Sequence, residues 1–512
     1  MDFLIALSPI LWLVVALSVM KMGAHKACPI ALVIAWVAGI LVNGMTVPHA
    51  WEASLEGVAL ACWPILLVII AAIFTYNLSL HTKAMDIIKQ MLTSVSADRR
   101  VLILLIGWGF GGFLEGMAGF GTAIAIPAGM LAGIGINPVM SAAVCLVANS
   151  VPTAYGSIGI PLATLASVTG NDPIQLATFT CLQLSPLILA CPFIMTIVAG
   201  EGISGLKGML PICLGAALGF LIPELTVASH MGPELAVVAG SIGAMGMIVA
   251  CARLFPPAHD ERYELQLPQK EKHITPEQEL VAWLPFILIF IFLLFTSKLI
   301  PAVHDPLFAI KSSVLIYTGE GGSPYTFTWL GTPGVLILLA AFIGGAVQKA
   351  SLGEMFGVLG TTVKNLRPTI ITIITVIATA KVMGYSGMTS QIAETAVAAT
   401  GTGYPLIAAF IGSVGTFITG SATSSCVLFG KLQTGAASAI GASSTVQAWI
   451  AAANATGACA GKMISPQSIA IGVAAIGVAG VESQLLKFAV KVYIPFVIVM
   501  GLIVYLSQTW LN

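Results

Sequence analysis

The sequence from Gly111 to Gly121 reads Gly-Gly-Phe-Leu-Glu-Gly-Met-Ala-Gly-Phe-Gly, which places one carboxylate and five glycines inside a long hydrophobic run. Glycine weakens a helix by roughly 1 kcal/mol per residue and leaves backbone groups free. In a membrane, such backbone is tolerated only where it is buried in protein or lines a wet cavity. The stretch therefore predicts a broken helix beside a polar cavity, with Glu115 at the break.

A weaker copy of this stretch lies 304 residues later, at Gly415–Ser425, and reads Gly-Thr-Phe-Ile-Thr-Gly-Ser-Ala-Thr-Ser-Ser. Other residues repeat at the same offset, namely Pro29 with Pro333 and Trp63-Pro64 with Arg367-Pro368. The alternative is that Gly and Pro align by chance in apolar sequence. Two broken helices at matching places in two halves indicate the binding site of a transporter.

The composition is that of a polytopic membrane protein. The 512 residues are 58% hydrophobic and 8% charged, whereas a soluble chain carries about 25% charged residues. The formal net charge of zero makes nucleic acid an unsuitable partner. Apolar segments predict an all-α fold with about 12–14 transmembrane helices. Four shorter apolar pieces are expected to be re-entrant or half-helical: 119–133, 157–169, 421–437 and 465–480.

The positions of Lys and Arg predict the orientation, because these residues favour cytoplasmic connections. Lys21 and Lys26 lie between the first two spans, and the basic connection Lys83–Arg100 follows the third, while 46–57 and 224–234 contain no Lys or Arg. We expect both termini to be extracytoplasmic, with Arg253–Glu279 cytoplasmic and Ser297–Thr328, which contains Lys298 and Lys311, outside. The segment matching Lys83–Arg100, residues 384–403, contains no Lys or Arg, as inverted repeats require.

These observations divide the chain into two membrane halves and a linker. Residues 1–254 form the first half, with repeat 1 at about 27–200, and residues 280–512 form the second, with repeat 2 at about 330–507. Residues 255–279, with Lys270, Lys272 and His273, are interpreted as a solvated cytoplasmic linker.

Ionisable residues within spanning segments cost several kcal/mol and are functional candidates. Glu115 is either a proton carrier or a cap for the amides freed at the break. Lys381 lies about fourteen residues into a spanning helix, so we expect it to face a cavity or to pair with Glu115. Lys431 and Lys462 either hold a substrate carboxylate as point charges or extend toward the membrane surface.

Hydroxyl and amide side chains gather at the breaks. They either pack helices together or bind a small anion, assisted by amides at half-helix N-termini. With Lys381 and Lys462, the predicted substrate-binding residues are Gly119, Gly121, Asn149, Ser150, Thr153, Tyr155, Thr419, Ser421, Thr423, Ser424, Ser425, Asn454, Ser465, Gln467 and Ser468.

Motifs for other chemistries are weak. Gly107, Gly109 and Gly112 fit G-x-G-x-x-G, but within a membrane helix. We find no P-loop, no C-x-x-C pair, and no nucleophile–base pair, and the seven histidines fall in or beside polar connections. We therefore expect no cofactor, no bound metal and no enzymatic activity.

Three segments resemble the bacterial L-lactate permease family, which includes glycolate permeases. The matching segments are Phe113–Gly121, Thr419–Ser425 and Gly461–Ile471 (Gly-Lys-Met-Ile-Ser-Pro-Gln-Ser-Ile-Ala-Ile). The similarity extends over nearly the whole chain and is densest at the breaks. It implies a cytoplasmic-membrane symporter that takes up L-lactate, glycolate or related 2-hydroxy acids with protons. Our hypothesis is that Glu115 carries the proton.

Two residues depart from the family pattern: Ala422 stands where an acidic residue is common, and Lys381 where an uncharged residue is usual. These departures leave the coupling ion and the exact substrate open. One rival is a transporter of another carboxylate or a sulfonate, with sodium as a possible coupling ion, and a second is an anion channel. Oligomeric state is also left open, with a homo-oligomer as one alternative.

Overall fold

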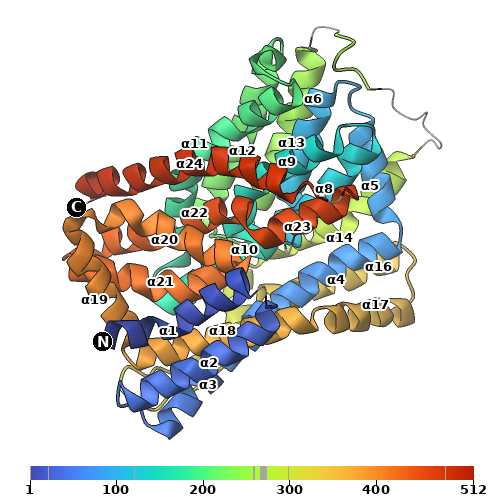
Figure 1. Ribbon diagram of the computed structural model, residues 1–512. Coiled ribbons are helices and arrows are strands. Elements are labelled where there is room, and N and C mark those ends of the chain that lie inside the picture. Colours follow the sequence, from blue (N-terminus) through green and yellow to red (C-terminus); the bar gives the residue numbers. More distant parts are fainter. Residues whose placement is uncertain are drawn as a thin grey trace.

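The computed structural model is almost entirely helical (Figure 1). It describes residues 2–20, 22–119, 121–257, 260–265, 274–297, 299–478 and 480–511. Within this part of the chain, ten helices are long and apolar enough to cross a membrane, or up to twelve if two bent helix pairs each count as one span. The prediction of an all-α polytopic membrane protein is confirmed.

The first half begins with helices that precede the basic connection and continues through the first break to the linker. Its helices are α1 (Asp2–Val14), η1 (Val15–Val19), α2 (Ala24–Leu41), α3 (Val47–Leu60), η2 (Ala61–Leu66), α4 (Leu67–His81), α5 (Ala84–Thr93), α6 (Arg99–Leu102), η3 (Ile103–Phe110), α7 (Gly111–Met117), α8 (Thr122–Gly133), α9 (Pro138–Ser150), η4 (Pro152–Tyr155), α10 (Gly156–Thr169), α11 (Pro173–Ala199), η5 (Ile203–Leu206), α12 (Leu210–His230) and α13 (Ala236–Leu254).

The second half adds a short hairpin before its own series of helices. Its elements are α14 (Pro276–Phe295), α15 (Pro301–Ala309), β1 (Lys311–Val314), β2 (Tyr325–Thr328), α16 (Pro333–Val347), α17 (Leu352–Asn365), α18 (Arg367–Tyr385), α19 (Met388–Thr400), η6 (Gly401–Gly403), α20 (Tyr404–Thr419), α21 (Ala422–Ala439), α22 (Ser444–Ile464), α23 (Pro466–Ile476) and α24 (Glu482–Leu511).

The four apolar pieces expected beside the breaks are separate helices, namely α8, α10, α21 and α23. Helix α9 and the segment 152–169 are bent by 58°, and α22 and α23 by 44°. Proline stands at both bends, as Pro152 and Pro466, where it can open a helix but cannot donate a backbone hydrogen bond. Local sequence therefore explains where each helix stops.

Helices of the first half pack against helices of the second half in a reciprocal pattern. Helices α17 and α19 begin 305 and 304 residues after α3 and α5, close to the offset in the sequence. Helix α2 packs against α18, and its counterpart α16 packs against α4; likewise α10 packs against α21, and α23 against α8. In Figure 1 the blue α2 lies beside the orange α18, and the blue α4 beside the yellow α16. This reciprocity is typical of two repeats related by a pseudo-two-fold axis.

Two segments taken as connections are largely helical. Residues 47–60 form α3, which Thr46 caps by accepting a hydrogen bond from the His49 amide (3.3 Å), and α12 continues to His230. The connection expected outside contains the antiparallel β1–β2 hairpin, in which Ser312 pairs with Phe327. Lys21, Lys298 and Asn512 lie outside the described residues.

Part of the linker between the halves is docked on the first half. Tyr263 is 5% exposed, its ring lies 4.0 Å from the Arg100 guanidinium carbon, and its carbonyl accepts a hydrogen bond from the Arg99 amide. Arg262 binds Asp260 and lowers the pKa of that carboxyl to about 2. Lys270, Lys272 and His273 lie outside the described residues.

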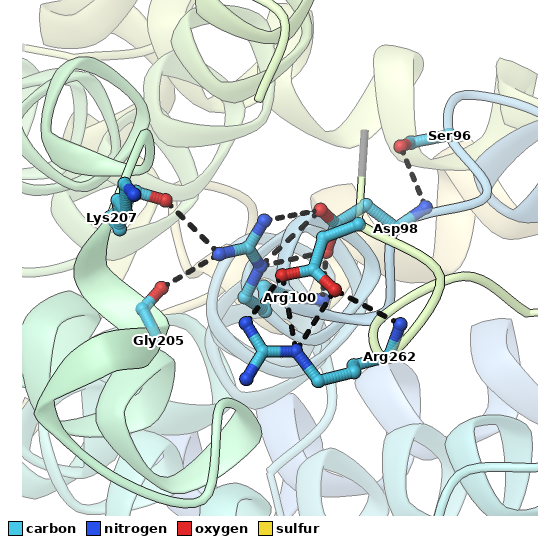
Figure 2. A network of polar contacts seen from close by, with 7 residues as sticks. Ser96, Asp98, Arg100, Gly205, Lys207 and Arg262 are labelled. Carbon is cyan, nitrogen blue, oxygen red and sulfur yellow. Dashed lines mark hydrogen bonds and ion pairs between the residues drawn. The ribbon is translucent and has the colours of Figure 1, made fainter. Parts of the chain in front are cut away.

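Beneath the docked segment, Arg100 is held in a polar network (Figure 2). It pairs with Asp98 at 2.7 Å and donates to the carbonyls of Gly205 and Lys207. Residues 260–265 are therefore attached to the ends of the first-half helices through Tyr263, while Glu261, Arg262 and Glu264 stay exposed.

Candidate functional site

A cavity of about 740 Å³ lies where broken helices of both halves meet. Its wall includes the first turns of α10, α21 and α23, the end of α20, and single residues from α7 and α22. The amino-terminal part of α18 and the residues around the start of α2 complete it. Helix N-termini present unpaired amides and partial positive charge, so their convergence favours an anion.

Glu115 supplies the carboxylate of the cavity from the end of α7. It is 4% exposed, and its Oε2 atom makes no hydrogen bond within the described part of the chain. Its Oε1 atom lies 2.8 Å from the position that a Cβ on Gly156 would occupy. The neighbouring Ser157 hydroxyl donates to the Ala118 carbonyl at 2.8 Å. The Oε2 atom therefore caps none of the amides at the break.

The second break is organised by hydroxyl groups at the start of α21. Ser421 caps the helix by accepting a hydrogen bond from the Ser424 amide at 3.2 Å. The Thr419 hydroxyl donates to the Gly415 carbonyl (2.7 Å) and accepts from the Ser421 amide (3.2 Å). These local bonds hold the first turn of α21 open toward the cavity.

Lys462 supplies the cation, from the last turn of α22. It is 6% exposed, and its Nζ atom donates to the Gly420 carbonyl at 2.9 Å, which joins the second break to the bent pair α22–α23. Gln467 lies in the next helix, α23, which Ser465 caps through the Ser468 amide (3.2 Å). Lys462 and Glu115 thus face one cavity from opposite halves of the chain.

Some of the site residues predicted from the sequence line the cavity, and others do not. Eight line the cavity: Glu115, Thr153, Thr419, Ser421, Thr423, Ser424, Lys462 and Gln467. The others are absent from its wall: Lys381, Asn149, Ser150, Tyr155, Ser425, Asn454, Ser465, Ser468, Gly119 and Gly121.

Several residues outside the cavity wall bond within the protein. Ser150 donates to the Val147 carbonyl, Tyr155 to that of Ala177 and Ser425 to that of Gly412. The Asn454 side chain accepts from Gln433 Nε2 at 3.2 Å. Such bonds fit the alternative that polar residues pack membrane helices together.

The expected pairing of Lys381 with Glu115 is wrong. Lys381 forms an ion pair with Glu56 of α3, and Tyr385 donates to the same carboxylate at 2.9 Å. Glu56 is 3% exposed. The sequence reading placed residues 46–57 in a connection and therefore missed Glu56, although Glu52 and Glu56 have the spacing of one helical face.

Other cavity residues were also missed. His25 lies at the start of α2, and Thr369 and Thr372 lie one turn apart in α18. The two threonines follow Arg367-Pro368 in an otherwise apolar helix. Polar residues at this position could have been recognised in the sequence as candidates for the cavity wall. Among the described residues, no group of three His, Cys, Asp or Glu side chains could hold a metal ion.

Comparisons with known proteins agree with the membrane fold. A family model described as L-lactate permease matches residues 2–511. An L-lactate permease of Streptococcus iniae is 42% identical over 441 residues, or 85% of this chain and 90% of the relative. The glycolate permease GlcA of Escherichia coli K12 is 32% identical over 537 residues, or 98% and 95%.

A solved structure shares the fold. MtrF of Neisseria gonorrhoeae, described as illuminating a class of antimetabolite efflux pumps, aligns with a TM-score of 0.53 and 15% identity over 96% of each chain. At this identity the similarity concerns the fold alone.

Proposed function

Because this chain belongs to the L-lactate permease family, we propose that it takes up L-lactate and related 2-hydroxy monocarboxylates such as glycolate by proton symport across a bacterial cytoplasmic membrane. The observation that carries the proposal is the cavity shared by Lys462, Glu115 and the N-termini of α21 and α23. The names of the L-lactate and glycolate permeases among its relatives support the substrate class.

The substrate carboxylate is held by the Lys462 ammonium and by the positive N-terminal ends of α21 and α23, where the Ser424 and Ser468 amides are already used by the caps. Hydroxyls of Thr423 and Ser424, in the first turn of α21, add hydrogen bonds to it. The substrate's 2-hydroxyl group binds Thr153 or Gln467 on the facing walls. A charge-assisted hydrogen bond contributes about 1.5–3 kcal/mol, so a few such contacts are enough for a small anion.

Glu115 couples the anion to a proton. A bound carboxylate and an ionised Glu115 in one cavity repel each other, and Lys462 provides a single balancing charge. Binding of the anion is therefore favourable together with a proton on Glu115. The unbonded Oε2 atom leaves that carboxyl free to accept the proton.

The two halves have inverted topology, and both termini are extracytoplasmic. The reciprocal packing of α2 with α18 and of α16 with α4 supports the inverted topology, and the positions of Lys and Arg support the orientation of the termini. The cavity wall includes His25, beside the basic connection between the first two spans. With this orientation, the part of the cavity wall that contains His25 lies on the cytoplasmic side.

The test is uptake of labelled L-lactate into proteoliposomes under an inward proton gradient at fixed sodium concentration. We expect accumulation above the external concentration that collapses with a protonophore, and we expect Glu115→Gln to abolish stimulation by the gradient. The matched control is Glu277→Gln, at an exposed position in the first turn of α14, which should behave as the parent protein.

Three results would contradict the proposal. Unaltered stimulation in Glu115→Gln would remove Glu115 from coupling. Accumulation driven by sodium instead would support the sodium-coupled rival, and flux that never exceeds the external concentration would support a channel.

A further inference from the structure

A second buried carboxylate, Glu224, lies inside the first half and away from the cavity wall. It belongs to α12, its exposed fraction is 0%, and no nitrogen or oxygen atom of the described residues hydrogen-bonds either carboxylate oxygen; the weak donor beside it is the Cys181 thiol. An unpaired carboxylate in a membrane interior costs several kcal/mol, and such residues mark proton relays and ion pathways. Helix packing alone gives no reason for a carboxyl group at this position.

In the part of the chain that the structure describes, no cation pairs with Glu224. Helix α12 packs against α11, α13 and η3. The titratable groups that interact with Glu224 are Cys181 of α11, Tyr155 of η4 and Cys459 of α22. Within the described residues, no Lys, Arg or His nitrogen lies within 4.0 Å of its carboxylate. An ion-pair role for Glu224 is therefore not supported.

Two short connections join Glu224 to Glu115. Tyr155, which interacts with Glu224, directly precedes Gly156, against which Glu115 lies. On α13, the ideal Cβ position of Gly240 is 3.1 Å from the Glu224 Cβ atom. The next residue, Ser241, places its hydroxyl 2.7 Å from the ideal Cβ of Gly112, one turn before Glu115.

Several helices of the first half that pack around η3 and α7 carry buried polar atoms without partners. Neither end of the Asn149 amide makes a hydrogen bond in the described structure, and the same holds for the hydroxyls of Thr164, Thr180 and Ser241. Buried polar groups in proteins normally bind another polar group or an internal water. These side chains belong to α9, α10, α11 and α13, and each is suited to bind an internal water molecule of the kind that passes protons.

The same helices lead to a second cavity. It has a volume of about 390 Å³ and includes Met231 after α12, Ile174 near the start of α11, Ser167 near the end of α10 and Leu235 just before α13. Met231 follows Glu224 by seven residues, or roughly 10 Å at 1.5 Å per helical residue. The β2 strand and the start of α16 line the other side of this cavity, on the side predicted to be extracytoplasmic.

We propose that Glu224 is a proton relay between the outer cavity and Glu115, on a route separate from that of the anion. The inference rests on the proposed proton symport. In the relay, the Glu224 carboxyl gives its proton through water to the Glu115 carboxylate. The Glu224 carboxylate left behind then takes a proton from hydronium in the outer cavity. No bond other than O–H forms or breaks, and one proton moves inward.

The test compares two transport modes of Glu224→Gln in proteoliposomes. Exchange of labelled for unlabelled lactate needs no net proton movement, so we expect it to stay within about 2-fold of the parent. Accumulation driven by a proton gradient should fall about 100-fold, the order by which a positioned proton-transfer group accelerates a step. Glu224→Asp, which keeps a carboxyl group, should restore part of the gradient-driven rate, and Glu277→Gln should change neither mode.

Infrared difference spectroscopy gives a readout that folding alone does not change. Lactate addition should change several carboxyl bands that are sensitive to deuterium exchange. One of these bands should be missing in Glu224→Gln, and its frequency should be shifted in Glu224→Asp. The relay would be overturned if Glu224→Gln left gradient-driven uptake unchanged. It would also be overturned if Glu224→Gln and Glu224→Asp lost lactate exchange to the same extent. If the parent protein itself shows no stimulation by the gradient, the proposed symport fails instead, so the two failures are distinguishable.

Discussion

The charges of single side chains decide what the central cavity can bind. Lys462 and Glu115 face it together, and Lys462 also bonds to the Gly420 carbonyl at 2.9 Å. That bond fixes the ammonium beside the start of α21 before any anion arrives. Affinity for a carboxylate should therefore depend on Lys462 more than on any one hydroxyl group.

Replacement of Lys462 tests this at the residue level. Lys462→Met removes a charge-assisted contact of about 1.5–3 kcal/mol, so we expect the KM for lactate to rise on the order of 10–100-fold. Lys462→Arg keeps the charge but changes its geometry and should give a smaller increase. Initial uptake rates at varied lactate concentration measure both. An unchanged KM in Lys462→Met would place the anion elsewhere.

At the level of elements, the breaks between helices position the site. Helix α20 ends at Thr419, Gly420 has φ +69°, and α21 starts after Ser421. Glycine adopts positive φ at little cost, whereas other residues lose roughly 1–2 kcal/mol there. A Cβ on Gly420 would also lie 2.8 Å from Gln467 Cδ.

Gly477 is a matched control for this break. It ends α23 with φ +66°, and no atom lies within 4 Å of its ideal Cβ among those described. We expect Gly477→Ala to lower the free energy of unfolding by about 1–2 kcal/mol with transport intact. Gly420→Ala should cost more and raise the KM, because Gln467 must move. Thermal unfolding in detergent and uptake kinetics measure the two effects, and equal behaviour of the variants would refute the role of the Gly420–Gln467 contact.

The breaks were predictable because glycine, proline and capping hydroxyls act on neighbouring backbone. Their signal is local, so the starts of α8, α10, α21 and α23 could be placed within a few residues. The cavity residues from α18 and the start of α2 were not found, because that proximity arises from packing between distant helices. Glu224 was missed for a related reason: the absence of Lys and Arg in 224–234 suggested a connection, whereas α12 continues through it.

At the scale of the molecule, a buried ion pair joins the two halves. Glu56 of α3 and Lys381 of α18 are 325 residues apart in sequence, and their side chains are 3% and 14% exposed. Tyr385 hydrogen-bonds the same carboxylate and stacks on Tyr317 from the connection before β2. Removal of one partner of a buried pair typically costs about 3–5 kcal/mol, because the other charge stays unpaired.

A double-mutant cycle tests this link. Glu56→Gln and Lys381→Met should each lower the free energy of unfolding by about 3–5 kcal/mol, and the double variant should lose much less than their sum. Denaturant unfolding in detergent provides the values. Additive losses would mean that the two side chains do not stabilise each other.

Because helices of each half pack against helices of the other, packing can be completed only late in synthesis of the chain. Helices α10 and α8 find their partners, α21 and α23, only after the ribosome has added some 300 further residues. At 5–20 residues per second this takes roughly 15–60 s. During that interval the first half resides in the lipid with its polar break uncovered, so a truncated chain is a natural target for membrane proteases. The polar break of the first half is therefore covered only once the second half has been made.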